Sequence, residues 1–91
     1  MIGRPIIFSQ HATDQMPSRG AAHEEVEEAI RSGERVPAQR GRQAYRKNFP
    51  FRANWKGRYY ETKQVVPVVV IEAETIIVVT VYVFYFGGEG Q

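Results

Sequence analysis

The fold is decided by the stretch Ile76-Ile77-Val78-Val79-Thr80-Val81-Tyr82-Val83-Phe84-Tyr85-Phe86. Its β-branched and aromatic side chains favour a strand, and eleven residues are too few for a helix that crosses a membrane. Successive side chains of a strand point to opposite faces. We expect the apolar odd-numbered set to pack under helices: Ile77, Val79, Val81, Val83 and Tyr85. Thr80 and Tyr82 then lie on the other face, which we predict to be the working surface.

Extended segments precede this strand. Residues 39–49 and 59–72 have the composition of strands, and residues 54–57 read as the turn between them. Residues 72–75 are predicted to form the hairpin connection to the last strand. Pro67 cannot donate a ladder hydrogen bond, so we expect a bulge or a sheet edge near it.

The first third of the chain predicts one short strand and two helices. Residues 5–8 form the strand, and Ser9 is placed to cap a brief helix that should end before Pro17. The second helix is predicted over residues 23–32, with Gly33 at its C-cap. Its predicted buried side consists of Val26, Ala29 and Ile30.

The predicted order is strand, two helices and three or four strands (β-α-α-β-β-β for the strands that can be located), which is an α+β fold. We expect the two N-terminal helices to pack on one face of a small, mostly antiparallel sheet. Ninety-one residues with 43% hydrophobic content support one core. A single domain over residues 1–86 and a flexible tail over residues 87–91 are therefore predicted.

Composition narrows the chemistry. The chain has no cysteine and only two histidines, His11 and His23, so we expect no metal site. Its start lacks the apolar run and cleavage site of a secretion signal, so we expect a cytoplasmic protein that is not associated with membranes.

Charge is segregated along the chain. Residues 35–63 carry nine lysines and arginines against a single carboxylate, Glu61. The preceding helix is acidic, with Glu24, Glu25, Glu27 and Glu28. A basic segment beside an acidic helix is typical of a protein that holds a polyanion on one surface, and nucleic acid is the first partner to consider. The alternative is that strand-edge lysines and arginines only discourage aggregation.

Three short motifs resemble a known family. They are Phe8-Ser9-x-His11-Ala12-x-x-x-Met16-x-x-Arg19-Gly20, then Glu24-Glu25-Val26-Glu27-Glu28-Ala29-Ile30, and Val68-Val69-Val70 followed by Ile77-Val78-Val79-Thr80-Val81-Tyr82. Short bacterial proteins with a His-Ala-x-x-Arg-Met-x-x-Arg-Gly signature carry this pattern, and they are similar to the RelE/ParE and BrnT group of type II toxins. In this chain Gln15 stands where that signature has arginine, which removes a cation, and Ala22 stands where it has a capping Ser or Thr.

The resemblance implies a RelE/ParE-like fold and a toxin-type endoribonuclease that is held inactive by an antitoxin protein. Such an enzyme cleaves RNA, including ribosome-bound mRNA, by activating a ribose 2′-hydroxyl, without a metal or cofactor. His11 is the candidate proton-transfer group, because its ordinary pKa is near neutrality. Arg19 matches a phosphate-holding position. The remaining catalytic candidates are Arg46, Lys63, Thr80 and Tyr82.

Further basic and aromatic residues are candidates for nucleic-acid binding. Arg40, Arg42 and Arg46 share one strand face by their spacing of two, which favours contact with phosphates. Lys47 is a further candidate cation. Trp55, with Lys56 and Arg58 nearby, could stack a base, or it could pack over the sheet or meet a protein partner.

Structural roles compete with each of these assignments. His11 could fasten its helix to the sheet, and Arg19 could bridge to an acidic neighbour. Thr80 and Tyr82 could serve only as sheet formers. Two other functions therefore stay open: a non-catalytic RNA- or ribosome-binding module, for which Gln15 is the best argument, and a protein-interaction domain, either gyrase-directed or a homodimer joined through residues 84–86.

Overall fold

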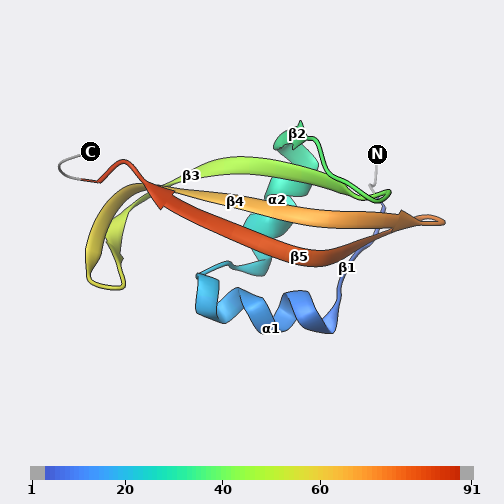
Figure 1. Ribbon diagram of the computed structural model, residues 1–91, viewed down its shortest axis with the longest axis horizontal. Helices are drawn as coiled ribbons and strands as arrows, with labels where there is room; N and C mark the ends of the chain where they lie inside the picture. The colour runs from blue at the N-terminus through green and yellow to red at the C-terminus, as the bar shows by residue number, and fades with distance from the viewer. Residues whose placement is uncertain (1–3, 89–91) are drawn as a thin grey trace.

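The computed structural model, described here for residues 4–88, has two helices against one mixed five-stranded sheet (Figure 1). The elements in chain order are β1 (Ile6–Phe8), α1 (Gln10–Arg19), α2 (His23–Ser32), β2 (Glu34–Val36), β3 (Gln43–Trp55), β4 (Arg58–Glu72) and β5 (Thr75–Phe86). The strands lie in the order β1-β5-β4-β3-β2. Strand β1 runs parallel to β5, and the other neighbours are antiparallel. The predicted α+β class and the mostly antiparallel sheet are confirmed.

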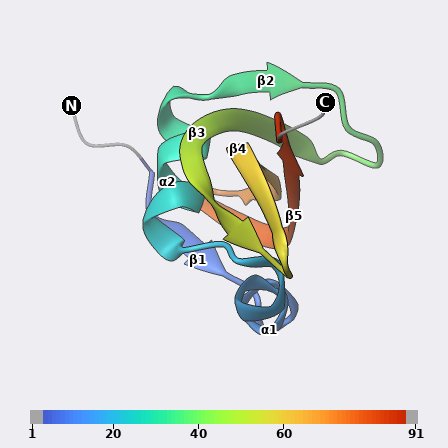
Figure 2. The same ribbon diagram turned by 90° about the vertical axis from the view of Figure 1, so that its left-hand side faces the viewer.

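The two helices cover different parts of the sheet. Helix α2 packs on β3 and β4, whereas α1 runs along β5. Figure 1 shows α2 behind the sheet and α1 beneath β5. Figure 2 shows that the connection after β2 projects on the side of the sheet away from α2. We call this side the helix-free face. No helix among residues 4–88 has the length and apolar character needed to cross a bilayer.

The core is formed where both helices meet β4 and β5. Val26 and Ile30 of α2 pack with buried valines of the sheet, as predicted for the second helix. Ala12 and Met16 supply the buried side of α1. The fully buried sheet residues of this cluster are Val65, Val69, Val78 and Val81. Their burial fixes which side of each strand faces the helices, and so which side remains for function.

Helix α1 is longer than the sequence predicts. The Ser9 hydroxyl oxygen accepts a hydrogen bond from the Ala12 N–H at 3.1 Å, which confirms the predicted N-cap. The expected stop before Pro17 is wrong, because the helix continues to Arg19. Gly20 ends it in a left-handed conformation (φ 77°), and its N–H returns to the Met16 and Pro17 carbonyls. Anchoring of the last turn to the sheet compensates for the bond that proline cannot make.

The alternation predicted for the last strand holds only after Val79: Val81 and Val83 pack toward the helices as expected, but Ile76 and Val78 do so in place of the predicted Ile77 and Val79. Val68 of β4 pairs with Thr80, but Val69 pairs with Val78, so Val79 is an extra residue on β5. This bulge reverses the alternation. Val78 before it and Val81 after it both face the core. Thr80 and Tyr82 remain on the helix-free face, as predicted, because they follow the bulge.

Two further features differ from expectation. Strand β2 was not located from the sequence, since it has only three residues. Pro67 lies in the central strand rather than at an edge, and the bulge near it has its extra residue on β5 rather than within residues 65–71 of β4, where a bulge was expected. In the predicted tail, the Gly87 carbonyl accepts a hydrogen bond from the Glu61 N–H at 3.3 Å, and residues 89–91 lie outside the described residues.

Helix α1 closes an otherwise open sheet edge. Strand β1 pairs with β5 only as far as Val78, so the peptide groups that follow need other partners. Gln15 Oε1 accepts from the Val81 N–H at 3.0 Å, and the Arg19 guanidinium donates to the Val81 carbonyl at 2.7 Å. The Ser9 hydroxyl reaches the Val79 carbonyl at 3.5 Å. Polar side chains of a helix thus replace a neighbouring strand.

Candidate nucleic-acid interface

A shallow groove of about 450 Å³ lies on the helix-free face. Its floor is formed by β4 and β5, including Val66, Val68, Thr80 and Tyr82. One wall is the connection between β2 and β3, residues 37–42, which carries Arg40 and Arg42. We call this feature the arginine groove. It brings together two predicted phosphate contacts and two predicted catalytic hydroxyls.

Arg40 and Arg42 are exposed, and neither side chain forms a hydrogen bond or ion pair with another described residue. Their expected place on one strand is wrong, since β3 begins only at Gln43. A turn holds them instead, with positive φ at Arg40 (61°) and Gly41 (73°). Both guanidinium groups are therefore available to a ligand at the groove wall, without a carboxylate to compete.

Two other candidate cations, Arg46 and Lys47, already have carboxylate partners. Arg46 shares the helix-free face but donates from Nε to Glu34 at 3.0 Å. Lys47 lies on the opposite side, where its ammonium is 3.8 Å from the Glu28 carboxylate of α2. The predicted face of three arginines is thus reduced to two free ones, and Lys47 does not belong to it.

Tyr82 begins a row of exposed aromatic side chains along β5. The exposed fractions are 46% for Tyr82, 51% for Phe84 and 39% for Phe86. The Tyr82 and Phe84 rings are nearly parallel, with centroids 6.5 Å apart and 19° between their planes. We call these three residues the aromatic row. Large apolar side chains at such exposure on one face are typical of a binding surface.

Arg19 and Thr80 lie beside the row and have structural partners. Arg19 donates to the Val81 carbonyl, and its guanidinium carbon lies 5.5 Å from the centre of the Tyr82 ring. The Thr80 hydroxyl donates to Gln15 Oε1 at 2.8 Å. The sequence did not predict a role for Gln15, which receives both this bond and the Val81 N–H. Its amide therefore fastens α1 to β5.

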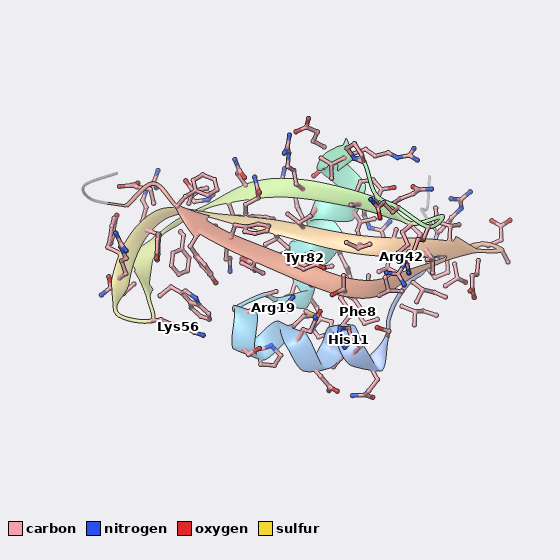
Figure 3. The ribbon with its side chains drawn as sticks, in the orientation of Figure 1. Phe8, His11, Arg19, Arg42, Lys56 and Tyr82 are labelled. Carbon is pink, nitrogen blue, oxygen red and sulfur yellow. The ribbon has the colours of Figure 1, made fainter. Side chains whose placement is uncertain are left out.

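His11 is exposed on α1 and forms no contact that fixes its ring. It lies four residues before Gln15 and eight before Arg19, so the three share one side of the helix. At about 1.5 Å per residue, His11 and Arg19 are about 12 Å apart along the helix axis. Figure 3 shows His11 toward the Arg42 end of the sheet, while Arg19 and Tyr82 lie nearer its middle. The catalytic candidates therefore do not converge at one point.

Lys63 is a buried side chain rather than a surface one. It is 8% exposed, and its ammonium binds Glu25 at 2.8 Å and the Gly20 carbonyl at 2.9 Å. These partners lie on the helical side of β4, so the expectation that Lys63 contacts phosphate does not fit its position. Its role in the fold is to join the loop between the helices to the central strand.

Trp55 also packs against the protein. Its ring stacks on Tyr85 with centroids 4.9 Å apart and planes 18° apart. Burial raises the pKa of the Tyr85 phenol to about 12, with the Glu25 carboxylate as a second cause. Lys56 lies 5.5 Å from the Trp55 ring at the hairpin tip, far along the sheet from Arg42 in Figure 3. Of the alternatives for Trp55, packing over the sheet is the one observed, and Arg58 remains exposed beside it.

Two polar residues that the sequence did not single out extend the interface. Gln64 of β4 pairs with Phe84 on one side and with Asn48 of β3 on the other, and its Nε2 donates to Asn48 Oδ1 at 2.9 Å. The period-2 alternation that places Thr80 and Tyr82 on this face also places Phe84 there, so Phe84 could have been found. Among residues 4–88, no group of three or more acidic, histidine or cysteine side chains could hold a metal ion.

Comparison with known proteins gives one match. The family model described as Domain of unknown function (DUF4258) matches residues 8–83, which covers the chain from the end of β1 to just past Tyr82, the first residue of the aromatic row. The search of curated proteins and the search of solved structures each found no significant match.

Proposed function

The chain belongs to the DUF4258 family, and from that premise we propose that it binds RNA on its helix-free face. The supporting observation is the arginine groove, where Arg40 and Arg42 are free of carboxylates beside Tyr82. Unpaired guanidinium groups next to exposed aromatic rings suit a ligand that has both phosphates and bases. The acidic helix α2 lies on the opposite face, so the electrostatic field of the protein directs a polyanion to the arginine groove.

The test is the salt dependence of RNA binding. A single-stranded RNA oligonucleotide should bind more weakly as salt rises, and log K should fall by about 0.7 per phosphate contact per unit of log salt. Arg42→Gln should lower the affinity and reduce the slope by about 0.7. Arg31→Gln makes the same charge change on α2 and should alter neither beyond twofold. Equal effects of the two variants would refute the groove as the binding site.

A second candidate function is the toxin-type endoribonuclease that the RelE/ParE and BrnT resemblance implies, controlled by an antitoxin. One observation favours it. Within residues 8–20, Ser9, Gln15 and Arg19 are engaged with β5, and Gly20 ends the helix, yet His11 has no partner. A free imidazole beside an RNA-binding face can accept the 2′-hydroxyl proton as that oxygen attacks the adjacent phosphorus. The phosphorus–5′-oxygen bond breaks, and the departing 5′-oxygen takes up a proton from water.

Cleavage assays decide this second function. Purified protein should convert RNA into fragments that end in 2′,3′-cyclic phosphate, and His11→Ala should slow this by about 10²- to 10⁴-fold. His23→Ala is the matched control, because the His23 ring packs against Phe8 with centroids 4.5 Å apart. Expression of the chain without an antitoxin should arrest growth. Intact RNA after incubation with the wild-type protein would leave binding alone as the function.

A further inference from the structure

We infer that the aromatic row is a base-stacking site, so that the RNA held by this face is single-stranded. The inference rests on the proposed RNA binding and adds the class of RNA. Tyr82, Phe84 and Phe86 occur at every second residue of β5 and all project from the helix-free face. Two residues of a strand span about 6.8 Å, so the row is about 14 Å long.

The ring geometry suits unpaired bases. Tyr82 and Phe84 are nearly parallel, and their centroids are 6.5 Å apart. Stacked bases in a duplex rise by about 3.4 Å each, and twice that interval is about 6.8 Å. The ring spacing is therefore close to that of alternate bases in a stacked strand, and a base could stack on either ring. The bases of a duplex already stack on one another and cannot use exposed rings in this way.

Polar groups lie where the edge of a stacked base would fall. Gln64 is the cross-strand neighbour of Phe84, and Asn48 is the next residue across the sheet. Because Gln64 Nε2 donates to Asn48 Oδ1, the Gln64 carbonyl oxygen remains as an acceptor and the Asn48 amide nitrogen as a donor. Amides beside a stacking ring provide hydrogen bonds to base edges.

The positive charge beside the aromatic row favours RNA over a second copy of this chain as its ligand. The groove that carries Arg40 and Arg42 also includes Tyr82, so the first ring of the aromatic row lies beside two free cations. The Arg19 guanidinium carbon lies 5.5 Å from the centre of the same ring. A base contributes a planar ring and its phosphate contributes negative charge, whereas a second copy of this chain would bring the same cations into contact.

The experiment compares one labelled RNA of ten nucleotides as a single strand and as a duplex. Phe84→Leu keeps an apolar side chain of similar size at a half-exposed position, so the fold should tolerate it. It should weaken single-strand binding about tenfold and leave both duplex binding and the salt slope unchanged. Phe84→Tyr should restore the affinity to within threefold. Ile7→Ala removes an apolar side chain of similar exposure (54%) from β1 and should have no effect.

Stacking has its own signature. A 2-aminopurine base in the strand should lose fluorescence on binding the wild-type protein, and less so on binding Phe84→Leu. Wild-type protein that binds RNA with no loss of affinity in Phe84→Leu would overturn the inference while leaving RNA binding intact. Wild-type protein that binds neither RNA would overturn both. A dimer that Phe84→Leu dissociates would assign the row to self-association and also overturn the inference.

Discussion

Gly20 is the residue where helix, loop and aromatic packing meet. Its φ of 77° lies in the left-handed region, which ends α1 without strain. A Cβ at this position would overlap the Tyr85 hydroxyl and lie 2.9 Å from the Trp55 ring. The Gly20 carbonyl accepts the bond from Lys63. Glycine is thus required by the backbone and by its neighbours at once.

Comparison of Gly20→Ala with Gly57→Ala separates the cost of the left-handed backbone from the cost of steric overlap with neighbouring side chains. Gly57 has a φ of 83°, but a Cβ there would meet no atom within 4 Å. Gly57→Ala should cost about 1 kcal/mol in the free energy of unfolding, from the backbone alone. Gly20→Ala should cost about 2 to 4 kcal/mol, because steric overlap is added. Urea denaturation measures both, and equal losses would show that Tyr85 and Trp55 yield without cost.

The residues of the N-terminal motif differ in how their roles can be recognised. Ser9 as an N-cap follows from its position before a helical stretch, and the sequence predicted it. Gln15 could not be predicted in the same way, since its partners, Thr80 and Val81, lie 65 and 66 residues away. In the sequence, Gln15 in place of the signature arginine indicated only the loss of a cation. In the structure, its side-chain amide holds α1 against β5.

At the scale of elements, the docking of α1 along β5 depends on a few side-chain bonds to peptide groups. Gln15→Met keeps the length and flexibility of the side chain but removes its acceptor, so the Val81 N–H loses its partner. The expected loss of unfolding free energy is about 1 to 3 kcal/mol. Thermal or urea unfolding measures it.

Gln10→Met is the control for this experiment. Gln10 lies on the same helix, but its amide bonds only the exposed Asp14 carboxylate, at 2.8 Å. Its replacement should change the unfolding free energy by less than about 0.5 kcal/mol. Similar effects of the two variants would mean that α1 is held by its apolar contacts alone.

Most elements could be predicted from local patterns, and the failures have physical causes. The second helix was predicted with the bounds observed, because its apolar stripe, acidic first turn and C-cap glycine agree. The end of α1 was wrong, because tertiary anchoring of Arg19 outweighs the local effect of Pro17. The bulge at Val79 was placed only near Pro67, since strand register depends on pairing between β4 and β5. Strand β2 exists only through its pairing with β3.

At the scale of the whole molecule, the side chains that stabilise the fold lie on one face of the sheet, and the side chains available to a ligand lie on the other. Its helical side holds the core, the Lys63–Glu25 ion pair and the stack of Trp55 on Tyr85. Its other side carries the arginine groove and the aromatic row. The sequence predicted one basic surface, but charge along the chain does not reveal which cations pair within the fold. Ion pairs with α2 and with the adjacent strand remove Lys47, Lys63 and Arg46 from the free set.

Substitutions on the two sides should therefore affect different properties: stability on the helical side and RNA affinity on the helix-free face. Lys63→Met leaves Glu25, whose side chain is 23% exposed, without its cation, and should cost about 2 to 3 kcal/mol in unfolding free energy. It should leave RNA affinity within twofold. Arg42→Gln should lower RNA affinity and change stability by less than about 0.5 kcal/mol. Paired denaturation and binding measurements test this, and a loss of RNA affinity in folded Lys63→Met would contradict the separation.

Helix α1 shields the margin of the sheet only as far as its own last turn. Val83 and Tyr85 follow Val81 at the same two-residue interval, so their amides and carbonyls also point outward, and no described segment pairs with them. Such a margin would recruit a strand from a neighbouring molecule in a concentrated solution. Arg19 and Lys56 line the adjoining hollow and repel an identical chain, so added salt, by weakening that repulsion, should favour aggregation.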